Sequence, residues 1–309
     1  MAGFFYQLFS SSSLFSLGLY HLICSTRYFL KSPHTYSAKP FHSLPLSSSS
    51  SNRFRCLPLH LLILCLFIAS LHQAIISSDP DPLLKGSTPV HRFTSLQSAA
   101  VLFFFFLLSL SLLLSESTSL LPIPPDLFFA LASAVFFLDH SVSAAAAASV
   151  QTSDLQVKCD SVSASVSALS SLLCLILACQ PRLFIVDVGL AASLCLQGLW
   201  ALQTGLSLYV ETFIPEGCHK MLDVVSGVES STKCDLDESK LRAVAILDLA
   251  FLVHVMFVVI VLMLTYALVA KSVGMRRLGA YEPLPTSTTA GTLGDSNHIQ
   301  MKALTGTQA

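Results

Sequence analysis

Charged residues are scarce in this sequence. Asp, Glu, Lys and Arg make up 11% of its 309 residues, against about 25% in an average soluble domain. So few charges cannot cover the surface of a soluble globule, and hydrophobic residues instead account for 53% of the chain. The net charge of −1 also lacks the basic excess of proteins that bind nucleic acid. We therefore exclude a soluble enzyme and a nucleic-acid-binding protein.

The sequence also lacks the short motifs of common enzymes. It contains no Walker loop, no GxSxG or HExxH motif and no glycine-rich dinucleotide turn, and its nine cysteines show no CxxC spacing. Each of those motifs brings a defined catalytic or metal-binding geometry. Their absence favours a protein that is not an enzyme, and we predict neither a cofactor nor a bound metal.

Long apolar runs recur along the sequence. A helix crosses about 30 Å of hydrocarbon with about 20 mainly apolar residues, and seven segments reach this length: 4–30, 57–76, 93–114, 127–148, 161–179, 184–210 and 243–270. Serines alternate with Val and Ala from Ser161 to Ser167 as in a strand, but an open strand in lipid leaves its backbone groups unpaired. We therefore predict an all-α fold, a polytopic seven-helix transmembrane bundle over residues 1–270, followed by a disordered cytosolic tail over 271–309.

The distribution of Lys and Arg predicts the orientation of the chain. The loops on the side of the C-terminal tail carry ten basic residues and the opposite loops carry seven. Basic residues collect on the cytosolic side of membrane proteins. We expect the N terminus to face the outside or a lumen and the C terminus to face the cytosol. The lipid bilayer of the plasma membrane or an endomembrane is then the expected partner.

With this orientation the loop 211–241 faces a compartment that permits disulfides. The loop contains Cys218 and Cys234. The sequence leaves two alternatives, a disulfide between them and a pair of free thiols. A disulfide would stabilise the loop by on the order of 3 kcal/mol. The remaining cysteines lie in or beside the predicted spans, where we expect them to act as small packing residues.

Five ionisable residues inside the predicted spans need a reason to be there, because each costs roughly 2.5–3.5 kcal/mol to insert at mid-membrane. They are Asp139, His140, Asp187, Asp248 and His254. Asp187 and Asp248 lie near helix ends, so we expect partial hydration and a structural role. The other three lie deeper. We expect His254 to face the Asp139–His140 pair across the bundle, where a structural hydrogen bond, a proton relay or a bound metal would each satisfy the arrangement.

The sixth predicted span carries small residues on one stripe, the pattern that lets two membrane helices approach closely. The stripe follows helical spacing i, i+4, i+7 and i+14 through Ala191, Cys195, Gly198 and Gly205. Gln197, Trp200 and Gln203 lie in the same span. We interpret these side chains as packing and interhelical hydrogen-bonding residues, with ligand contact as the alternative.

The segment Leu196 to Gly205, which reads LQGLWALQTG, is followed by Tyr209. This pattern resembles the transmembrane protein 45 family, also called domain of unknown function 716, and particularly its plant branch. Further matching residues are His91-Arg92-Phe93-Thr94, His140, His254 and Tyr266.

The resemblance covers the chain from its first span to about Ala270. It implies a seven-span membrane protein of unestablished biochemistry whose plant members are connected with pathogen responses. The sequence departs from it at Val142, where a further histidine would be expected, and in the fifth span, which has no histidine. This departure weakens the case for a site in which several histidines bind a metal.

Several functions stay open. The leading hypothesis is a membrane protein that moves or senses a small solute, or that scaffolds partners. An intramembrane zinc hydrolase would need three converging histidines, and a haem-bearing electron carrier would need paired histidines on facing helices. The candidates are His91, His140 and His254 for zinc, and His60, His72, His140 and His254 for haem. A seven-helix receptor rests on the number of spans alone.

The tail contains one short targeting pattern. Tyr281 and Leu284 fit the Tyr-x-x-apolar form of cytosolic sorting signals. Such a signal would take the protein through endosomes to the plasma membrane or a vacuole. Four-residue matches of this kind are frequent by chance, so the chance match is the alternative.

Overall fold

The computed structural model describes residues 2–43, 56–76, 90–118, 122–148, 154–222 and 229–273. They form seven helices that are long and apolar enough to cross a membrane. These are α1 (Ala2–Lys31), α2 (Leu57–Ile76), α3 (Val90–Ser117), α4 (Pro125–Ala148), α5 (Asp154–Cys179), α6 (Phe184–Tyr209) and α7 (Asp237–Val273). The prediction of an all-α fold with seven spanning helices is confirmed. The predicted sorting signal at Tyr281 and Leu284 lies outside the described residues.

Several helices extend beyond the apolar runs that predicted them. α5 begins at Asp154 rather than Ser161, and α7 has 37 residues, more than the roughly 20 that a hydrocarbon core requires. The first turn of α7 contains Asp237 and Glu238, whose negative charges favour a helix N-terminus. Polar helix ends therefore continue past the apolar windows, and hydropathy alone underestimates their length.

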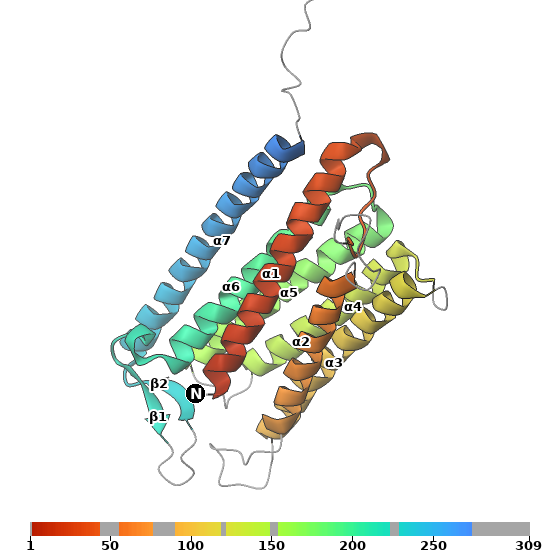
Figure 1. Ribbon diagram of the computed structural model, residues 1–309. Helices are drawn as coiled ribbons and strands as arrows, with labels where there is room; N and C mark the ends of the chain where they lie inside the picture. The colour runs from red at the N-terminus through yellow and green to blue at the C-terminus, as the bar shows by residue number, and fades with distance from the viewer. Residues whose placement is uncertain are drawn as a thin grey trace, which may run out of the picture. The chain divides into compact units, whose positions relative to one another are not determined.

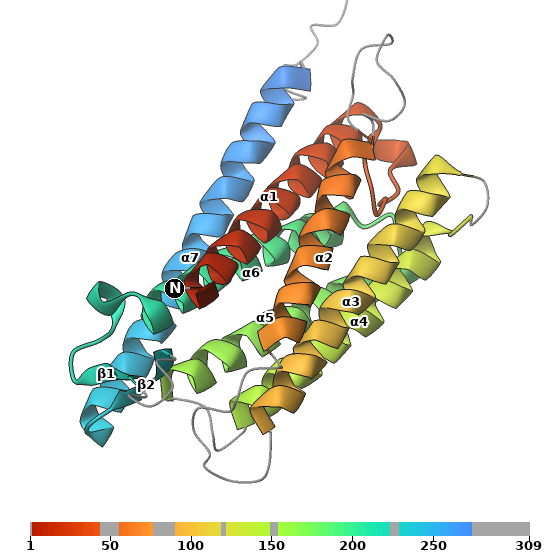
Figure 2. The same ribbon diagram turned by 60° about the horizontal axis from the view of Figure 1, so that its bottom comes forward.

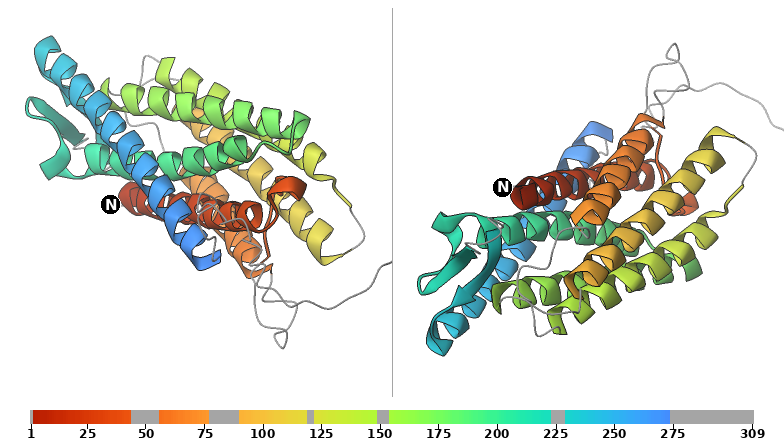
Figure 3. Two further views of the ribbon diagram at one scale, coloured as in Figure 1. Left: turned by 90° about the horizontal axis from the view of Figure 1, so that it is seen from above. Right: turned by 90° about the horizontal axis from the view of Figure 1, so that it is seen from below.

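Helices α1 to α6 surround a common interior (Figures 1 and 2). α1 packs along α6, α6 along α5, and α5 along α4, while α4 contacts α3, α3 pairs with α2, and α2 touches α1. α7 lies outside this ring against α1, α5 and α6, as the views from above and below in Figure 3 show. Many of its exposed side chains are large and apolar, among them Leu249, Met263 and Leu268. Such a surface suits contact with lipid tails.

The contact between α1 and α6 is unusually close because glycines lie in it. A Cβ atom added at Gly198 of α6 would lie 2.7 Å from the backbone nitrogen of Phe15 and 2.9 Å from the carbonyl oxygen of Ser11, both in α1. A Cβ at Gly18 of α1 would lie 2.8 Å from the carbonyl oxygen of Ala191. The small-residue stripe of α6 is thus the surface on which α1 lies.

A β-hairpin connects α6 to α7 at one end of the bundle. After a short 3-10 turn, η3 (Glu211–Phe213), strand β1 (Cys218–Leu222) pairs antiparallel with β2 (Glu229–Cys234). Cys218 and Cys234 face each other in register and form a disulfide. Gly217 precedes β1 with a φ of 83°, a conformation that glycine adopts without strain. The sequence pattern did not predict these strands.

The close α1–α6 contact predicts opposite effects for two glycines of the same helix. We expect Gly198→Ala to destabilise the protein by about 1–3 kcal/mol, because the new methyl group meets backbone that cannot move aside. Gly189→Ala is the matched control, since its Cβ would meet only Leu173 side-chain carbons at 3.5 Å or more and alanine favours a helix. Thermal unfolding in detergent should show a lower midpoint for Gly198→Ala alone. Equal midpoints would contradict the packing described here.

Candidate functional site

A buried polar network joins the end of α1 to the start of α6. Asp187 of α6 has no exposed surface. Its Oδ1 lies 2.8 Å from His21 Nε2 of α1, and its Oδ2 accepts a hydrogen bond of 2.6 Å from the Tyr36 hydroxyl. Both carboxylate oxygens are therefore satisfied, as a buried charge requires.

The segment after α1 folds back to complete this network. Pro33 opens the short turn η1 (Pro33–Thr35), and the Ala38 backbone N–H then donates to the Pro181 carbonyl in the α5–α6 turn at 2.7 Å. Tyr36 is thereby placed edge-on to Phe184 and is almost fully buried. A segment outside the spans thus covers the polar end of two helices.

Ser25 and His42 extend the network. The Ser25 hydroxyl is fully buried and lies 3.5 Å from both His21 Nε2 and His42 Nε2. The Tyr20 hydroxyl donates to the His42 carbonyl oxygen. His21 and His42 therefore lie together at the inner end of the folded-back segment.

Burial sets the protonation of the groups in this segment. Desolvation, followed by the neighbouring His21, lowers the pKa of His42 to about 4. His42 is thus neutral at physiological pH, with one ring nitrogen able to donate and the other able to accept. Burial and then the Asp187 charge raise the pKa of Tyr36 above its ordinary value. Tyr36 therefore keeps its proton and acts as a donor to Asp187.

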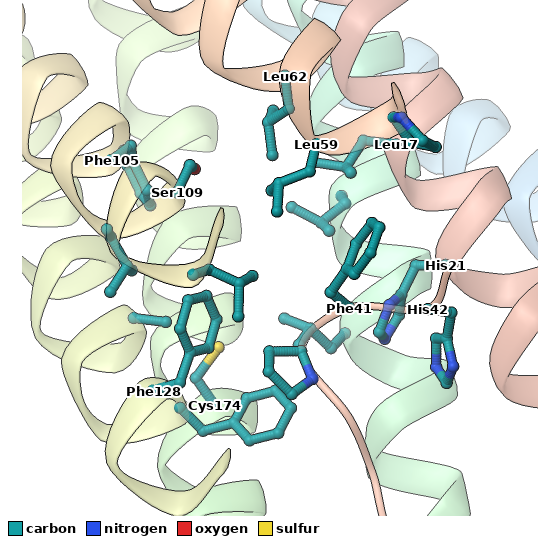
Figure 4. Close-up of a pocket in the computed structure, with 18 of the residues that line it drawn as sticks. Leu17, His21, Phe41, His42, Leu59, Leu62, Phe105, Ser109, Phe128 and Cys174 are labelled. Carbon is teal, nitrogen blue, oxygen red and sulfur yellow. The ribbon is translucent and has the colours of Figure 1, made fainter. Parts of the chain in front are cut away.

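A cavity of about 150 Å³ adjoins the network inside the helix ring. Figure 4 shows His21, His42 and Phe41 on one side of it, opposite Phe105, Ser109 and Phe128. Most of its lining is aliphatic or aromatic, with side chains from α1 to α6. The polar side chains in its lining are Tyr20, His21, His42 and Ser109.

The position of Asp187 differs from our expectation. Its place near the helix end predicted partial hydration, but the structure buries it completely. The reason is that the segment after α1 folds back and places Tyr36 against Asp187. No helical pattern in the sequence predicts this fold of the segment. Asp248 agrees better with the expectation, because its side chain is 56% exposed and forms an ion pair of 2.6 Å with Lys158 of α5.

The deeper ionisable residues bond to different partners from those we expected. His140 Nδ1 lies 2.9 Å from the Ala164 carbonyl of α5, and His254 Nδ1 lies 2.6 Å from the Ala250 carbonyl of its own helix. Asp139 accepts a hydrogen bond from the Ser167 hydroxyl. Within the described part of the chain, His254 forms no hydrogen bond with Asp139 or His140. Its ring instead meets that of Trp200 edge-on at 6.4 Å.

The residues of the α6 motif have separate roles. Trp200 is buried, donates through Nε1 to the Cys159 carbonyl at 3.0 Å and packs beneath the hairpin with Leu155 and Leu247. Gln203 donates to Ser207 of its own helix. Gln197 donates to Ser167 of α5. Gly205 is buried against Gln7 of α1.

The remaining histidine candidates do not gather into one site. His60 of α2 bonds to the carbonyl of Cys56 just before that helix, and His72 stacks on Tyr6 at 4.6 Å between ring centroids. The side chain of His91 lies outside the described residues. Over the described ranges, no three His, Cys, Asp or Glu side chains come together in a way that could hold a metal ion.

Sequence reasoning missed most of the network around Asp187. His21 lies within the first predicted span and carries the same insertion cost as the histidines that we singled out, so this signal was available. Ser25, Tyr36 and His42 gave no comparable signal. Tyr36 and His42 lie in a proline-rich segment that reads as an ordinary loop, and Ser25 is one of many span serines.

Residues 125–267 match the model of a family of unknown function, DUF716. The matched region runs from α4 into the last turns of α7 and contains the α6 motif. The match confirms the family that this motif predicted. No curated protein matches the chain.

The network predicts that Tyr36 stabilises the fold through its hydroxyl. Tyr36→Phe removes one donor from a buried carboxylate, and hydrogen bonds to charged groups are worth about 1.5–3 kcal/mol. We expect a lower midpoint of thermal unfolding in detergent. Tyr28→Phe is the control, because the Tyr28 ring contacts that of Tyr36 at 5.6 Å without a hydrogen bond to Asp187. A Tyr36→Phe protein as stable as the wild type would refute the role of this bond.

Proposed function

We propose that this multi-pass membrane protein of the DUF716 family binds a small, mainly apolar molecule inside its helix ring, as a sensor or carrier of that molecule. The cavity beside His21 and His42 carries this proposal. It is lined mostly by aliphatic and aromatic side chains, with His21 and His42 on one side and Ser109 on the other. Binding sites for small molecules commonly combine an apolar lining with a few placed polar groups.

The size of the cavity limits the ligand. A protein cavity of about 150 Å³ lined by apolar side chains is large enough to bind benzene, and the cavity here has a volume of about 150 Å³. The ligand class is therefore a molecule of about one aromatic ring. A single polar substituent on that ring would find a partner in the Tyr20 hydroxyl, the neutral His42 or Ser109.

The rival functions have less support in the arrangement of possible ligands. A zinc hydrolase or a haem carrier needs histidine nitrogens directed at a shared ion. Among the residues that the structure describes, no three His, Cys, Asp or Glu side chains come together in a way that could hold a metal ion, and the His254 ring packs against Trp200. We therefore favour ligand binding over metal-dependent chemistry.

We further propose that the hairpin faces the outside or a lumen and that the C-terminal end of α7 faces the cytosol. The Cys218–Cys234 disulfide supports this orientation, since structural disulfides persist in oxidising compartments. The excess of basic residues on the tail side supports it independently.

Two variants test this orientation in intact cells, one keeping only Cys218 and Cys234 and one keeping only Cys179, an exposed thiol at the opposite end of α5. We expect a membrane-impermeant maleimide to label the first after treatment with an impermeant reductant. The second should be labelled only after permeabilisation. The reverse pattern would overturn the orientation.

The cavity proposal is tested with indole and phenol as probes. We expect both to raise the thermal midpoint of the purified protein in detergent and to bind in equilibrium dialysis. Leu112→Trp should weaken binding at least tenfold, because Leu112 lines the cavity and is 6% exposed. Leu107→Trp on the same helix is the control, since Leu107 is 42% exposed outside the cavity lining.

Ser109→Leu is a second, smaller filling variant that serves if the tryptophan prevents folding. Ser109 lines the same cavity. The proposal fails if neither probe binds the wild type, or if a folded cavity variant binds as tightly as Leu107→Trp.

A further inference from the structure

A second set of polar side chains lies next to the cavity, one helical turn nearer the hairpin. On each of four helices that line the cavity, a polar residue lies three or four positions from a lining residue in the direction of the hairpin. The pairs of lining and polar residue are Leu17 and Ser13, Leu62 and Cys65, Phe136 and Asp139, and Leu194 and Gln197. Residues at this spacing share one face of a helix. Ser13 and Cys65 meet across α1 and α2, with 3.6 Å between oxygen and sulfur. We call Asp139, Ser167 and Gln197 with this pair the polar layer.

The hydrogen bonds of the polar layer run in one direction. The Gln197 amide donates to Ser167 Oγ at 3.1 Å and to Asp139 Oδ2 at 3.5 Å, and the Ser167 hydroxyl donates to Asp139 Oδ2 at 2.5 Å. This order turns the amide nitrogen of Gln197 toward Ser167. Its carbonyl oxygen, Oε1, is buried and has no hydrogen-bond partner. A buried acceptor left without a donor costs about 1–3 kcal/mol, so the layer is short of a donor.

The polar layer is also short of positive charge. Asp187 lies against His21, and Asp248 pairs with Lys158, whereas no described Lys or Arg forms an ion pair with Asp139. The adjacent His140 is directed at the Ala164 carbonyl. An aspartate within a bundle is normally balanced by a partner because desolvating an unpaired charge is costly. Asp139 thus has hydrogen-bond donors and a neighbouring histidine, but no ion pair with a described Lys or Arg.

We propose that the polar layer binds a small organic cation that carries a primary ammonium group. One such group supplies a positive charge for Asp139 and up to three N–H donors, one of which Gln197 Oε1 can accept. Hard metal ions such as Ca²⁺ take six or more oxygen ligands, more than the Asp139 carboxylate and Gln197 Oε1 provide.

The rings of Tyr6 and His72 stack with 4.6 Å between their centroids, nearer the hairpin than Ser13 and Cys65 on the same two helices. His72 Nδ1 is a further buried atom with no hydrogen-bond partner. The site goes beyond the proposed function, because it needs no occupant in the apolar cavity.

Saturation-transfer NMR on the full chain in detergent at pH 7 tests the site with 1-propylamine as the probe. 1-Propanol is the matched neutral compound of nearly the same shape. We expect the amine to bind at least tenfold more tightly than the alcohol. Asp139→Asn should weaken amine binding at least tenfold. Asp248→Asn is the control and should change it less than twofold, because that carboxylate already pairs with Lys158.

Three results would overturn the site. The first is equal affinity for the amine and the alcohol, a comparison that needs only the wild type and decides the matter if Asp139→Asn does not fold. The second is unchanged amine binding by a folded Asp139→Asn protein. The third is displacement of the amine by NaCl but not by choline chloride at the same ionic strength, which indicates a metal-ion site. Indole should leave amine affinity unchanged, so failure of the cavity proposal and failure of this one are separate outcomes.

Discussion

The rest of the structure depends on the close contact between α1 and α6. Its glycines bring backbone against backbone, so the two helices keep one register along most of their length. That register places His21 of α1 beside Asp187 of α6. It also directs one face of each helix into the ring, where the cavity lies. In a membrane this kind of fit has to come from packing, because lipid tails compete equally for apolar side chains.

The interior of the ring divides into three zones along the helix axes. The network of Asp187, His21 and Tyr36 closes one end, the apolar cavity follows, and the polar layer around Asp139 lies toward the hairpin. The same helices supply all three zones because their inward faces change character from turn to turn. On α4, for example, the cavity residues Ala132 and Phe136 are followed by Asp139. The two proposed ligands, one with an apolar body and one with an ammonium group, would thus occupy different, adjacent environments.

Much of the fold follows from patterns within single segments. The apolar runs predicted the seven helices because length and composition decide whether a segment can cross a membrane. Ala191, Cys195, Gly198 and Gly205 predicted a surface for close packing, and the α6 motif predicted the family. The ends of α5 and α7 were misjudged, since their polar turns continue a helix that hydropathy no longer recognises.

The candidate sites were less predictable because their members are distant in the sequence. Asp139 stood out as an ionisable residue in a span, but its contact with Ser167 depends on how α4 meets α5. His254 bonds within α7 rather than across the bundle, since that helix lies outside the ring. Asp187 is buried by a segment whose proline-rich sequence reads as a loop.

The sequence by itself determined that the chain is a set of membrane-spanning helices, because a segment's length and apolarity are properties of that segment alone. Only the tertiary structure decided which polar groups meet, which of them are left unpaired and where an apolar cavity remains. His21 and Asp187, for example, differ by 166 in residue number. A contact of that range depends on how whole helices pack, and residue types near each position do not encode it.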